Sequence, residues 1–425
     1  MQKIIEPLLA ADKAFDLADS GKTEVPQKVE ETVTEAASMD HPVVLTDHLV
    51  DVGTITEFDE AVAMNKLEER YLGGGCSCVV TQVGGKNLVG RNMDLSLSEN
   101  TAFKFVLDIN EYKAIGITYS PFMKGITFEE VVAGGVPEGI RAVFPYNATD
   151  YLNEAGLYIE NNMRNTEEGY VNHGTNPDSD IKIFSASIPA YVATRCKTVD
   201  EVVELVKTLN VYTAENPVPW NFCFTIADAE GNYGVLEIAK DKVSFLPGQN
   251  GQANYYLTPE FAKDAKFSSG KSRFAVLNEG LDKVTSPEQM LKHMEKVCYS
   301  QCYNADHLRE ATFDIRSEFA HTFPVNAEGN YDPENGSDEN CTTAWITDDS
   351  RIDEVYEMIC QYMQDNYGKY YTDGVCNFDA IRADAKNLPD YWVSAYSLAV
   401  DCSAKTMTAR FWEDTTNNLV FSFGE

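Results

Sequence analysis

Apolar and polar residues alternate in short runs along most of the chain, and the runs come in pairs separated by turn residues. Residues 76–83 and 88–94 flank a Gly-Gly-Lys-Asn turn, and residues 221–227 and 233–239 flank an Asp-Ala-Glu-Gly-Asn turn. Alternation with period two, interrupted by glycine and asparagine, predicts β-hairpins. The same pattern predicts a further hairpin from residues 103–109 and 114–119, and strands over residues 392–401, 407–413 and 419–423.

Four stretches between these runs have helical periodicity instead, namely residues 56–72, 199–209, 287–297 and 352–366. Hairpins that alternate with helices favour antiparallel sheets covered by helices over a doubly wound parallel sheet. The pattern therefore predicts an α+β fold.

Three consecutive glycines at residues 73–75 mark a change in the character of the chain. They follow the helix predicted over 56–72 and end it abruptly, and strands follow them. The first 75 residues hold sixteen acidic and six basic side chains. We therefore divide the chain into an acidic, partly helical leader over residues 1–75 and a main domain over residues 76–425.

Composition and charge narrow the classes of function. The chain is 44% hydrophobic and 24% charged, which is ordinary for a globular protein, but its net charge is −33. Such a charge repels phosphates, so we expect no nucleic-acid partner. No apolar run is long enough for a membrane span, and early acidic residues argue against a signal peptide.

The ten cysteines are spread along the chain without a dense disulfide pattern. This indicates reduced thiols and a cytoplasmic location, while secretion stays open if a signal segment once preceded this sequence. The pairs Cys76/Cys78 and Cys298/Cys302 have no histidine at zinc-finger spacing, so we expect no metal.

The most specific chemistry lies in the Gly-Gly-Gly-Cys76-Ser-Cys78 run and the Gly-Arg91-Asn-Met-Asp94 run after it. A hairpin between them returns Arg91 and Asp94 beside Cys76. A nearby guanidinium lowers the pKa of a thiol, and a carboxylate can hold an ammonium group. If Cys76 were the first residue, its own α-amine, with a pKa of about 7.7–8.0, could act as the base. Alone, each residue has an ordinary structural explanation; together, after three glycines, they favour a nucleophile.

The run CSCVVTQVGGKNLVGRNMD resembles the mature N-terminus of the choloylglycine hydrolase family, which includes bile salt hydrolases and penicillin V acylases. Cys76, followed by a small hydroxyl residue, fits the start of that family better than Cys78. The resemblance covers most of residues 76–425. It implies a four-layer αββα N-terminal-nucleophile hydrolase fold with two central antiparallel sheets, and no metal or organic cofactor.

Three later segments extend the resemblance and imply further site residues. The Asn-Glu-Ala-Gly-Leu segment at 153–157 leads into a strand whose active-site asparagine would be Asn162, with Asn161 as the alternative. The Ser-Arg-Phe segment at 272–274 implies an active-site Arg273. The segment 253–259 resembles the strand that supplies an oxyanion-hole asparagine, which here would be Asn254.

Together these features predict hydrolysis of a linear amide C–N bond in an N-acyl compound, after the bond following Gly75 is cut. The substrate would be a small molecule: a conjugated bile salt, penicillin V, or an N-acyl amino acid or lipid amide. A dipeptidase or an acyltransferase on the same fold is the alternative, and a non-enzymatic acidic binding protein is another. A homo-oligomer stays open, since family members often form tetramers.

Overall fold

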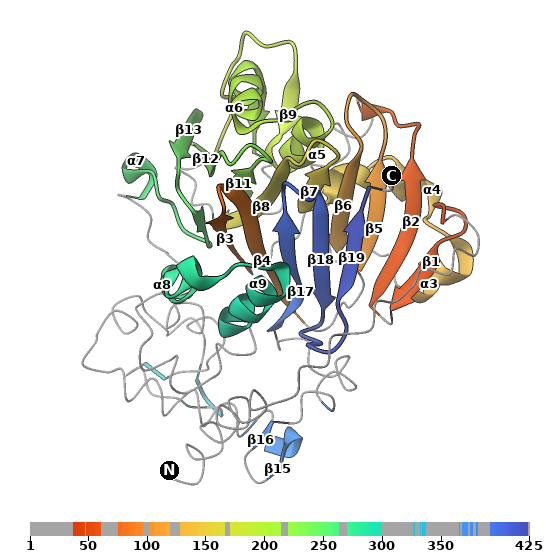
Figure 1. The fold of residues 1–425 in the computed structure, drawn as a ribbon, viewed down its shortest axis with the longest axis vertical. Coiled ribbons are helices and arrows are strands. Elements are labelled where there is room, and N and C mark those ends of the chain that lie inside the picture. The colour runs from red at the N-terminus through yellow and green to blue at the C-terminus, as the bar shows by residue number, and fades with distance from the viewer. Residues whose placement is uncertain are drawn as a thin grey trace.

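Two large β-sheets make up most of the described chain (Figure 1). The computed structural model describes residues 37–46, 48–60, 75–96, 102–119, 128–165, 171–213, 220–262, 270–298 and 392–423, with a few short pieces between 326 and 380. The predicted helix over 352–366 lies outside this part except for residue 365, and the one over 56–72 lies mostly outside it.

One sheet has nine strands in the order β1-β2-β5-β6-β7-β8-β11-β12-β13. Neighbouring strands are antiparallel except β2 and β5, which run parallel. The predicted hairpins β5–β6 and β11–β12 are confirmed. The strands are β1 (Val43–Thr46), β2 (Leu49–Ile55), β5 (Ala102–Leu107), β6 (Ala114–Tyr119), β7 (Asp150–Asn153), β8 (Tyr158–Asn165), β11 (Trp220–Ala227), β12 (Tyr233–Ala239) and β13 (Lys242–Pro247).

The other sheet has six strands in the order β14-β3-β4-β17-β18-β19, all antiparallel. The predicted hairpin β3–β4 is confirmed, and its turn uses Gly84 and Gly85 with φ of 59° and 81°, values that favour glycine. The strands are β14 (Gly251–Gln252), β3 (Gly75–Val83), β4 (Lys86–Ser96), β17 (Trp392–Asp401), β18 (Thr406–Phe411) and β19 (Leu419–Ser422). Strand β4 lies inside this sheet, between β3 and β17. Its residue Asp94 pairs with Ser394 on β17, although 300 residues separate the two in the chain.

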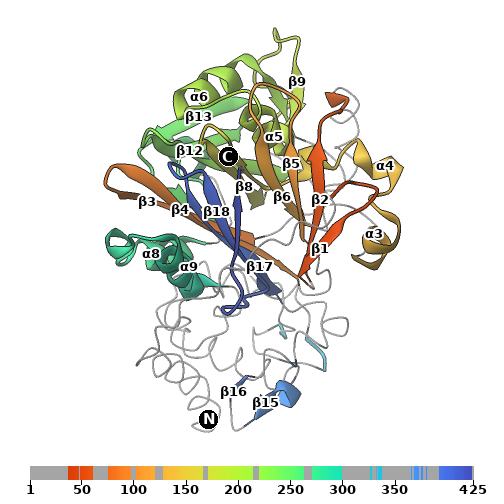
Figure 2. The ribbon, with the colours of Figure 1, turned by 45° about the vertical axis from the view of Figure 1, so that its right-hand side comes forward.

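Helices cover the outer face of each sheet (Figure 2). Helices α8 (Lys271–Asn278) and α9 (Pro287–Met294) contact the six-stranded sheet through β3, β4 and β17. Helices α5 (Ile188–Ala193) and α6 (Val199–Thr208) contact the nine-stranded sheet through β7, β8, β12 and β13. The predicted helices over 199–209 and 287–297 are confirmed, the second ending in a 3-10 turn (Glu295–Val297).

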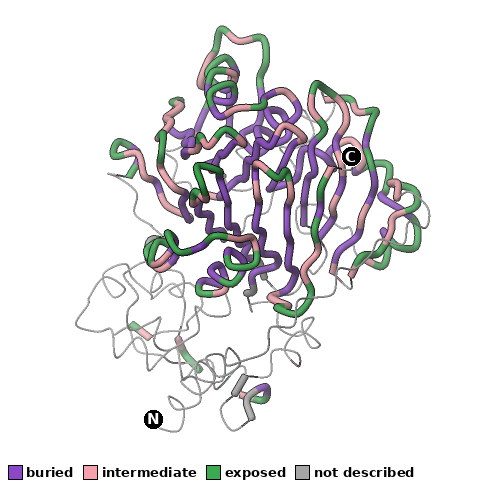
Figure 3. The backbone as a smooth tube through the Cα atoms, viewed as in Figure 1, coloured by how far each residue is buried: buried purple, intermediate pink, exposed green. Residues whose placement is uncertain are grey.

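Strand β4 shows how the layers are stacked, because its two faces meet different partners. Val89 and Met93 belong to the core between the sheets. Gly90 faces α9 so closely that a Cβ there would lie 2.4 Å from Met290 Sδ. The strands of both sheets are largely buried (Figure 3). The expected α+β class with two large sheets is confirmed, and the sheets are antiparallel as expected except where β2 pairs with β5.

Smaller elements surround these layers. Among the described residues they include helices α3 (Phe128–Gly134), α4 (Glu138–Arg141) and α7 (Pro259–Ala262), with the strand pairs β9 (Lys182–Phe184) with β10 (Asn210–Tyr212) and β15 (Tyr371–Thr372) with β16 (Val375–Cys376). The described helices include none whose length and apolar character would let it cross a membrane.

Candidate active site

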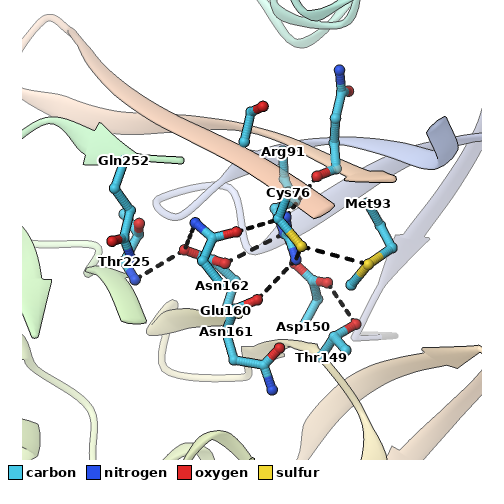
Figure 4. Close-up of polar contacts among 12 residues, drawn as sticks. Cys76, Arg91, Met93, Thr149, Asp150, Glu160, Asn161, Asn162, Thr225 and Gln252 are labelled. Atoms are coloured by element: carbon cyan, nitrogen blue, oxygen red, sulfur yellow. Dashed lines mark hydrogen bonds and ion pairs between the residues drawn. The ribbon is translucent and has the colours of Figure 1, made fainter. Parts of the chain in front are cut away.

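The hairpin β3–β4 brings Cys76 and Arg91 to one face of the six-stranded sheet, between the sheets (Figure 4). Across this ladder Cys76 pairs with Met93 and Cys78 pairs with Arg91, so these side chains share a face. Arg91 reaches diagonally along it, and its Nη2 donates to Cys76 Sγ at 3.1 Å. Met93 Sδ lies 3.6 Å from the same sulfur. Arg91 therefore lies beside Cys76, as the sequence predicts.

Burial, more than charge, determines the state of the Cys76 thiol in the uncut chain. The residue is 2% exposed, and desolvation raises the pKa of its thiol to about 11, although Arg91 acts to lower that pKa. The expected influence of Arg91 has the right direction, but burial outweighs it. The Cys76 thiol is therefore protonated at neutral pH before any cut.

Two carboxylates beneath Cys76 hold the Arg91 guanidinium. Arg91 Nε lies 3.2 Å from Asp150 Oδ1 on β7 and 3.4 Å from Glu160 Oε2 on β8, and all three side chains are fully buried. The Tyr158 and Tyr396 hydroxyls each donate to Asp150 at 2.6 Å. These contacts orient the guanidinium so that Nη2 points at the sulfur.

Burial also changes the titration of Glu160. Desolvation raises its carboxyl pKa to about 7, even though Arg91 lowers it. Its Oε1 accepts from the Thr225 backbone N–H at 3.0 Å and from Asn162 Nδ2 at 3.2 Å. The charge on Glu160 therefore changes near neutral pH, next to the guanidinium that contacts Cys76.

A second charged pair lies on the opposite face of the hairpin, toward helix α8. Arg273 Nη1 lies 3.2 Å from Asp94 Oδ2, and it also donates to Ser77 Oγ at 3.0 Å and to the Cys76 carbonyl at 3.2 Å. The Ser394 hydroxyl donates to Asp94 Oδ1 at 2.5 Å. Desolvation raises the pKa of Asp94 to about 6, against the lowering effects of Arg273 and Ser394.

Asn254 connects this pair to the backbone of Cys76. Its Oδ1 accepts from the Cys76 N–H at 2.9 Å and from Arg273 Nη2 at 2.9 Å, while its Nδ2 donates to the Met163 carbonyl at 2.9 Å. The Cys76 nitrogen, which would become the α-amine, is thus bound by Asn254 in the uncut chain.

The two candidate asparagines on β8 lie on opposite faces of the strand. Asn162 points toward Cys76, and its Oδ1 accepts from Arg91 Nη1 at 3.2 Å. The side chain of Asn161 points away from Cys76 (Figure 4), and only its backbone carbonyl reaches Arg91 Nη2, at 3.0 Å. Of the two, Asn162 is the one whose side chain faces the candidate nucleophile.

All six residues expected from the sequence therefore lie around the start of β3, and the sequence missed three of their close partners. Asp150, Glu160 and Ser394 come from three strands that approach Cys76 only in the folded chain. One signal was available for Glu160, because every second residue from 160 to 164 on β8 is polar and buried. Polar side chains on the inner face of a covered strand often mark a site.

Comparison with known proteins gives one match at the level of a family. Residues 76–253 match the model of the linear amide C–N hydrolases, choloylglycine hydrolase family. The curated proteins include no match to this chain.

Several solved structures resemble the chain weakly. A mutant conjugated bile acid hydrolase from Clostridium perfringens is 13% identical, with a TM-score of 0.39, and the match covers 82% of this chain and 92% of that one. A penicillin V acylase from Agrobacterium tumefaciens is 13% identical, with a TM-score of 0.38 over 82% and 86% of the two chains. Likenesses this weak carry no argument about activity. Residues 76–253 of this chain are thus similar to the choloylglycine hydrolase family of linear amide C–N hydrolases.

Proposed function

We propose that this chain hydrolyses the amide bond of an N-acyl compound with Cys76 as the nucleophile, after the peptide bond following Gly75 has been cut. The observation that carries the proposal is the 3.1 Å contact between Arg91 Nη2 and Cys76 Sγ at the start of β3. The family match also begins at residue 76, which supports this residue as the first of the working enzyme.

The cut itself can use the same sulfur. Cys76 Sγ attacks the Gly75 carbonyl carbon, the C–N bond to Cys76 breaks, and the nitrogen leaves as an amine that has gained the thiol proton. Water then hydrolyses the thioester, which returns the thiol and leaves a carboxylate on Gly75. Because the thiol pKa is about 11 in the uncut chain, thiolate is scarce and we expect this step to be slow.

Cutting changes the chemistry of Cys76 in two ways. It creates an α-amine, whose ordinary pKa of about 7.7–8.0 suits it to take the thiol proton at neutral pH. It also removes the covalent constraint of Gly75, so that a substrate amide can occupy the place of the former peptide bond. The thiolate then attacks the substrate carbonyl, the amine product leaves with the proton from the α-ammonium group, and water hydrolyses the acyl thioester.

The two asparagines are the proposed donors to the tetrahedral oxyanion. Asn254 already lies at the Cys76 backbone nitrogen, and one of its two amide hydrogens is used by the Met163 carbonyl. Asn162 accepts a hydrogen bond from Arg91 through its Oδ1. A well-placed donor of this kind contributes about 2.7–4 kcal/mol to transition-state stabilisation. Asn254 is the better placed, because it contacts the residue that reacts.

The charged residues have supporting roles in the proposal. Arg91 favours the thiolate, because its guanidinium Nη2 lies 3.1 Å from the sulfur. Arg273 fixes the Cys76 carbonyl and Asn254 together. Asp94 holds Arg273 and, once the chain is cut, is close enough in register to the Gly75 position to bind the new ammonium group.

The substrate is proposed as a class: conjugated bile salts, penicillin V, and N-acyl amino acids or lipid amides. The match of residues 76–253 to the family supports a small linear amide, and no single acyl group is favoured. The net charge of −33 gives anionic substrates no long-range attraction.

Denaturing intact-mass spectrometry tests the proposal, followed by the panel of amides. We expect two fragments separating between Gly75 and Cys76, and amide hydrolysis by the cut protein. Cys76→Ala should stop both, while Cys78→Ala, the matched control on the same strand face, should keep both. A cut that persists in Cys76→Ala would exclude self-cleavage.

The rival functions give different results in the same assays. Transfer of the acyl group to an added amine, in place of water, would indicate an acyltransferase, and turnover of dipeptides alone would indicate a dipeptidase. An uncut chain without activity toward any amide would favour an acidic binding protein.

A further inference from the structure

The first 75 residues contribute two strands to the main fold. Strand β2 pairs in parallel with β5, and β1 lies at the outer edge of the same nine-stranded sheet. Three side chains of β2 have no exposed surface and belong to the principal core, and a fourth is 5% exposed: Leu49, Val50, Val52 and Ile55. Figures 1 and 2 both show β2 beside β5, as part of the sheet.

Backbone hydrogen bonds continue this pairing beyond the ladder. The Ala102 N–H donates to the His48 carbonyl at 2.8 Å, and the Asp108 N–H donates to the Ile55 carbonyl at 2.9 Å. Farther out, the Val136 N–H donates to the Met39 carbonyl at 2.6 Å. The segment 37–60 is therefore bonded along its length to chain that follows residue 101.

Side-chain contacts hold both β2 and the residues that follow it. Asp51 and Lys104 form an ion pair at 2.8 Å, with both side chains less than one fifth exposed. Past the end of the strand, Glu60 Oε2 lies 2.7 Å from Arg195 Nη2, and its Oε1 accepts from the Tyr146 hydroxyl.

We propose that the segment 37–60 stays bound after the cut at Gly75, so that the working enzyme consists of two non-covalently associated chains. The inference rests on the proposed function, since it concerns the product of that cut. Residues 1–75 would then be a permanent small subunit that completes the sheet.

The reason is that cutting after residue 75 changes none of these contacts. Apart from the β1–β2 pairing, the contacts named above join residues 37–60 to residues beyond 101, and none of them involves residue 75 or 76. Departure of the segment would leave β5 as an edge strand with unpaired backbone groups and would expose buried side chains beside β2, such as Phe103, the register partner of Val50. Such edges are unstable and prone to aggregation.

Native mass spectrometry and size-exclusion chromatography of the cut protein test the inference, with denaturing mass spectrometry of the same sample. We expect two chains under denaturing conditions and one complex with the mass of the uncut protein under native conditions. Recovery of active residues 76–425 free of the small chain would overturn the inference.

A matched pair of variants identifies the interface. Val50→Asp places a charge at a fully buried position, whereas Val44→Asp changes its register partner on β1, which is 44% exposed. We expect the small chain to be lost from Val50→Asp together with activity, and retained in Val44→Asp. Equal retention in both would contradict the assigned interface. If Val50→Asp does not fold, the native mass of the unmodified cut protein still decides.

Failure of the proposed cut would be recognised separately, as a single chain under denaturing conditions. In that case a recognition sequence for an added protease, introduced within residues 61–74, supplies the cut. Co-migration of the two pieces would then support the interface without any self-cleavage, and their separation would refute it.

Discussion

Replacing Glu160 by glutamine tests whether burial raises the pKa of this carboxyl group, which contacts Arg91. Glu160 is fully buried, with Oε2 3.4 Å from Arg91 Nε, and desolvation raises its pKa from 4.5 to about 7. Arg91 keeps a second carboxylate partner, Asp150 at 3.2 Å, so the variant does not leave the guanidinium without a counter-charge.

The magnitude follows from linkage between protonation and folding. Because the pKa of Glu160 is higher in the folded chain, folding favours its neutral form. The associated stability is fully present below a pH of about 4.5, the unfolded pKa, and is lost as the pH rises through about 7. A shift of this size corresponds to roughly 3 kcal/mol at 1.36 kcal/mol for each pKa unit. About 2 kcal/mol of this loss falls between pH ~5.5 and ~8.

The assay is urea unfolding of both proteins at pH ~5.5 and ~8, where the acidic chain carries a large net charge. As the pH rises from ~5.5 to ~8, we expect the free energy of unfolding of Glu160→Gln to rise by about 2 kcal/mol relative to that of the wild type. Altered hydrogen bonds to Thr225 or Asn162 add a constant offset that cancels in this comparison.

The control is Glu204→Gln on helix α6, whose side chain is 74% exposed and should show no such gain. A difference between Glu160→Gln and the wild type that is the same at both pH values would refute the argument, because it would mean that Glu160 titrates normally. The variant should also lower the pKa of the Cys76 thiol, which ionised Glu160 raises. The pH dependence of alkylation measures this thiol pKa.

Two further predictions concern the surroundings of the site. Ser394→Ala removes the hydrogen bond to Asp94, so the pKa of Asp94 should rise above about 6. A hydrogen bond to a charged group contributes about 1.5–3 kcal/mol. If activity requires the Asp94 carboxylate, the acidic limb of the pH–activity profile should therefore move up by about one pH unit. An unmoved limb would exclude Asp94 as the titrating group. Gly251→Ala would place a Cβ 2.1 Å from the Cys78 carbonyl oxygen at a φ of 118°, whereas Gly248, with a φ of 71°, has open space around it. Thermal unfolding should show Gly251→Ala to be about 1–3 kcal/mol less stable than Gly248→Ala, and equal stability would contradict the observed closeness of β14 to β3.

The sequence by itself determined the hairpins, two of the helices and the placement of Arg91 beside Cys76. Hairpins connect strands that are adjacent in the chain, so alternation and turn residues suffice to predict β3–β4, β5–β6 and β11–β12. Once the β3–β4 register is set, Arg91 must lie on the same face as Cys76. The sequence also supplied Asn254 and Arg273, through motifs of the family.

Only the tertiary structure decided which side chains contact Arg91 and Asp94, and which strand pairs with β5. Asp150 and Glu160 reach Arg91 from the other sheet, and Ser394 reaches Asp94 through the pairing of β17 with β4; no local pattern encodes these contacts. The parallel pairing of β2 with β5 is of the same kind and was not predicted, because the acidic composition of residues 1–75 hides a short apolar strand. Burial is a property of the whole fold, and it outweighs the lowering of the Cys76 pKa by Arg91.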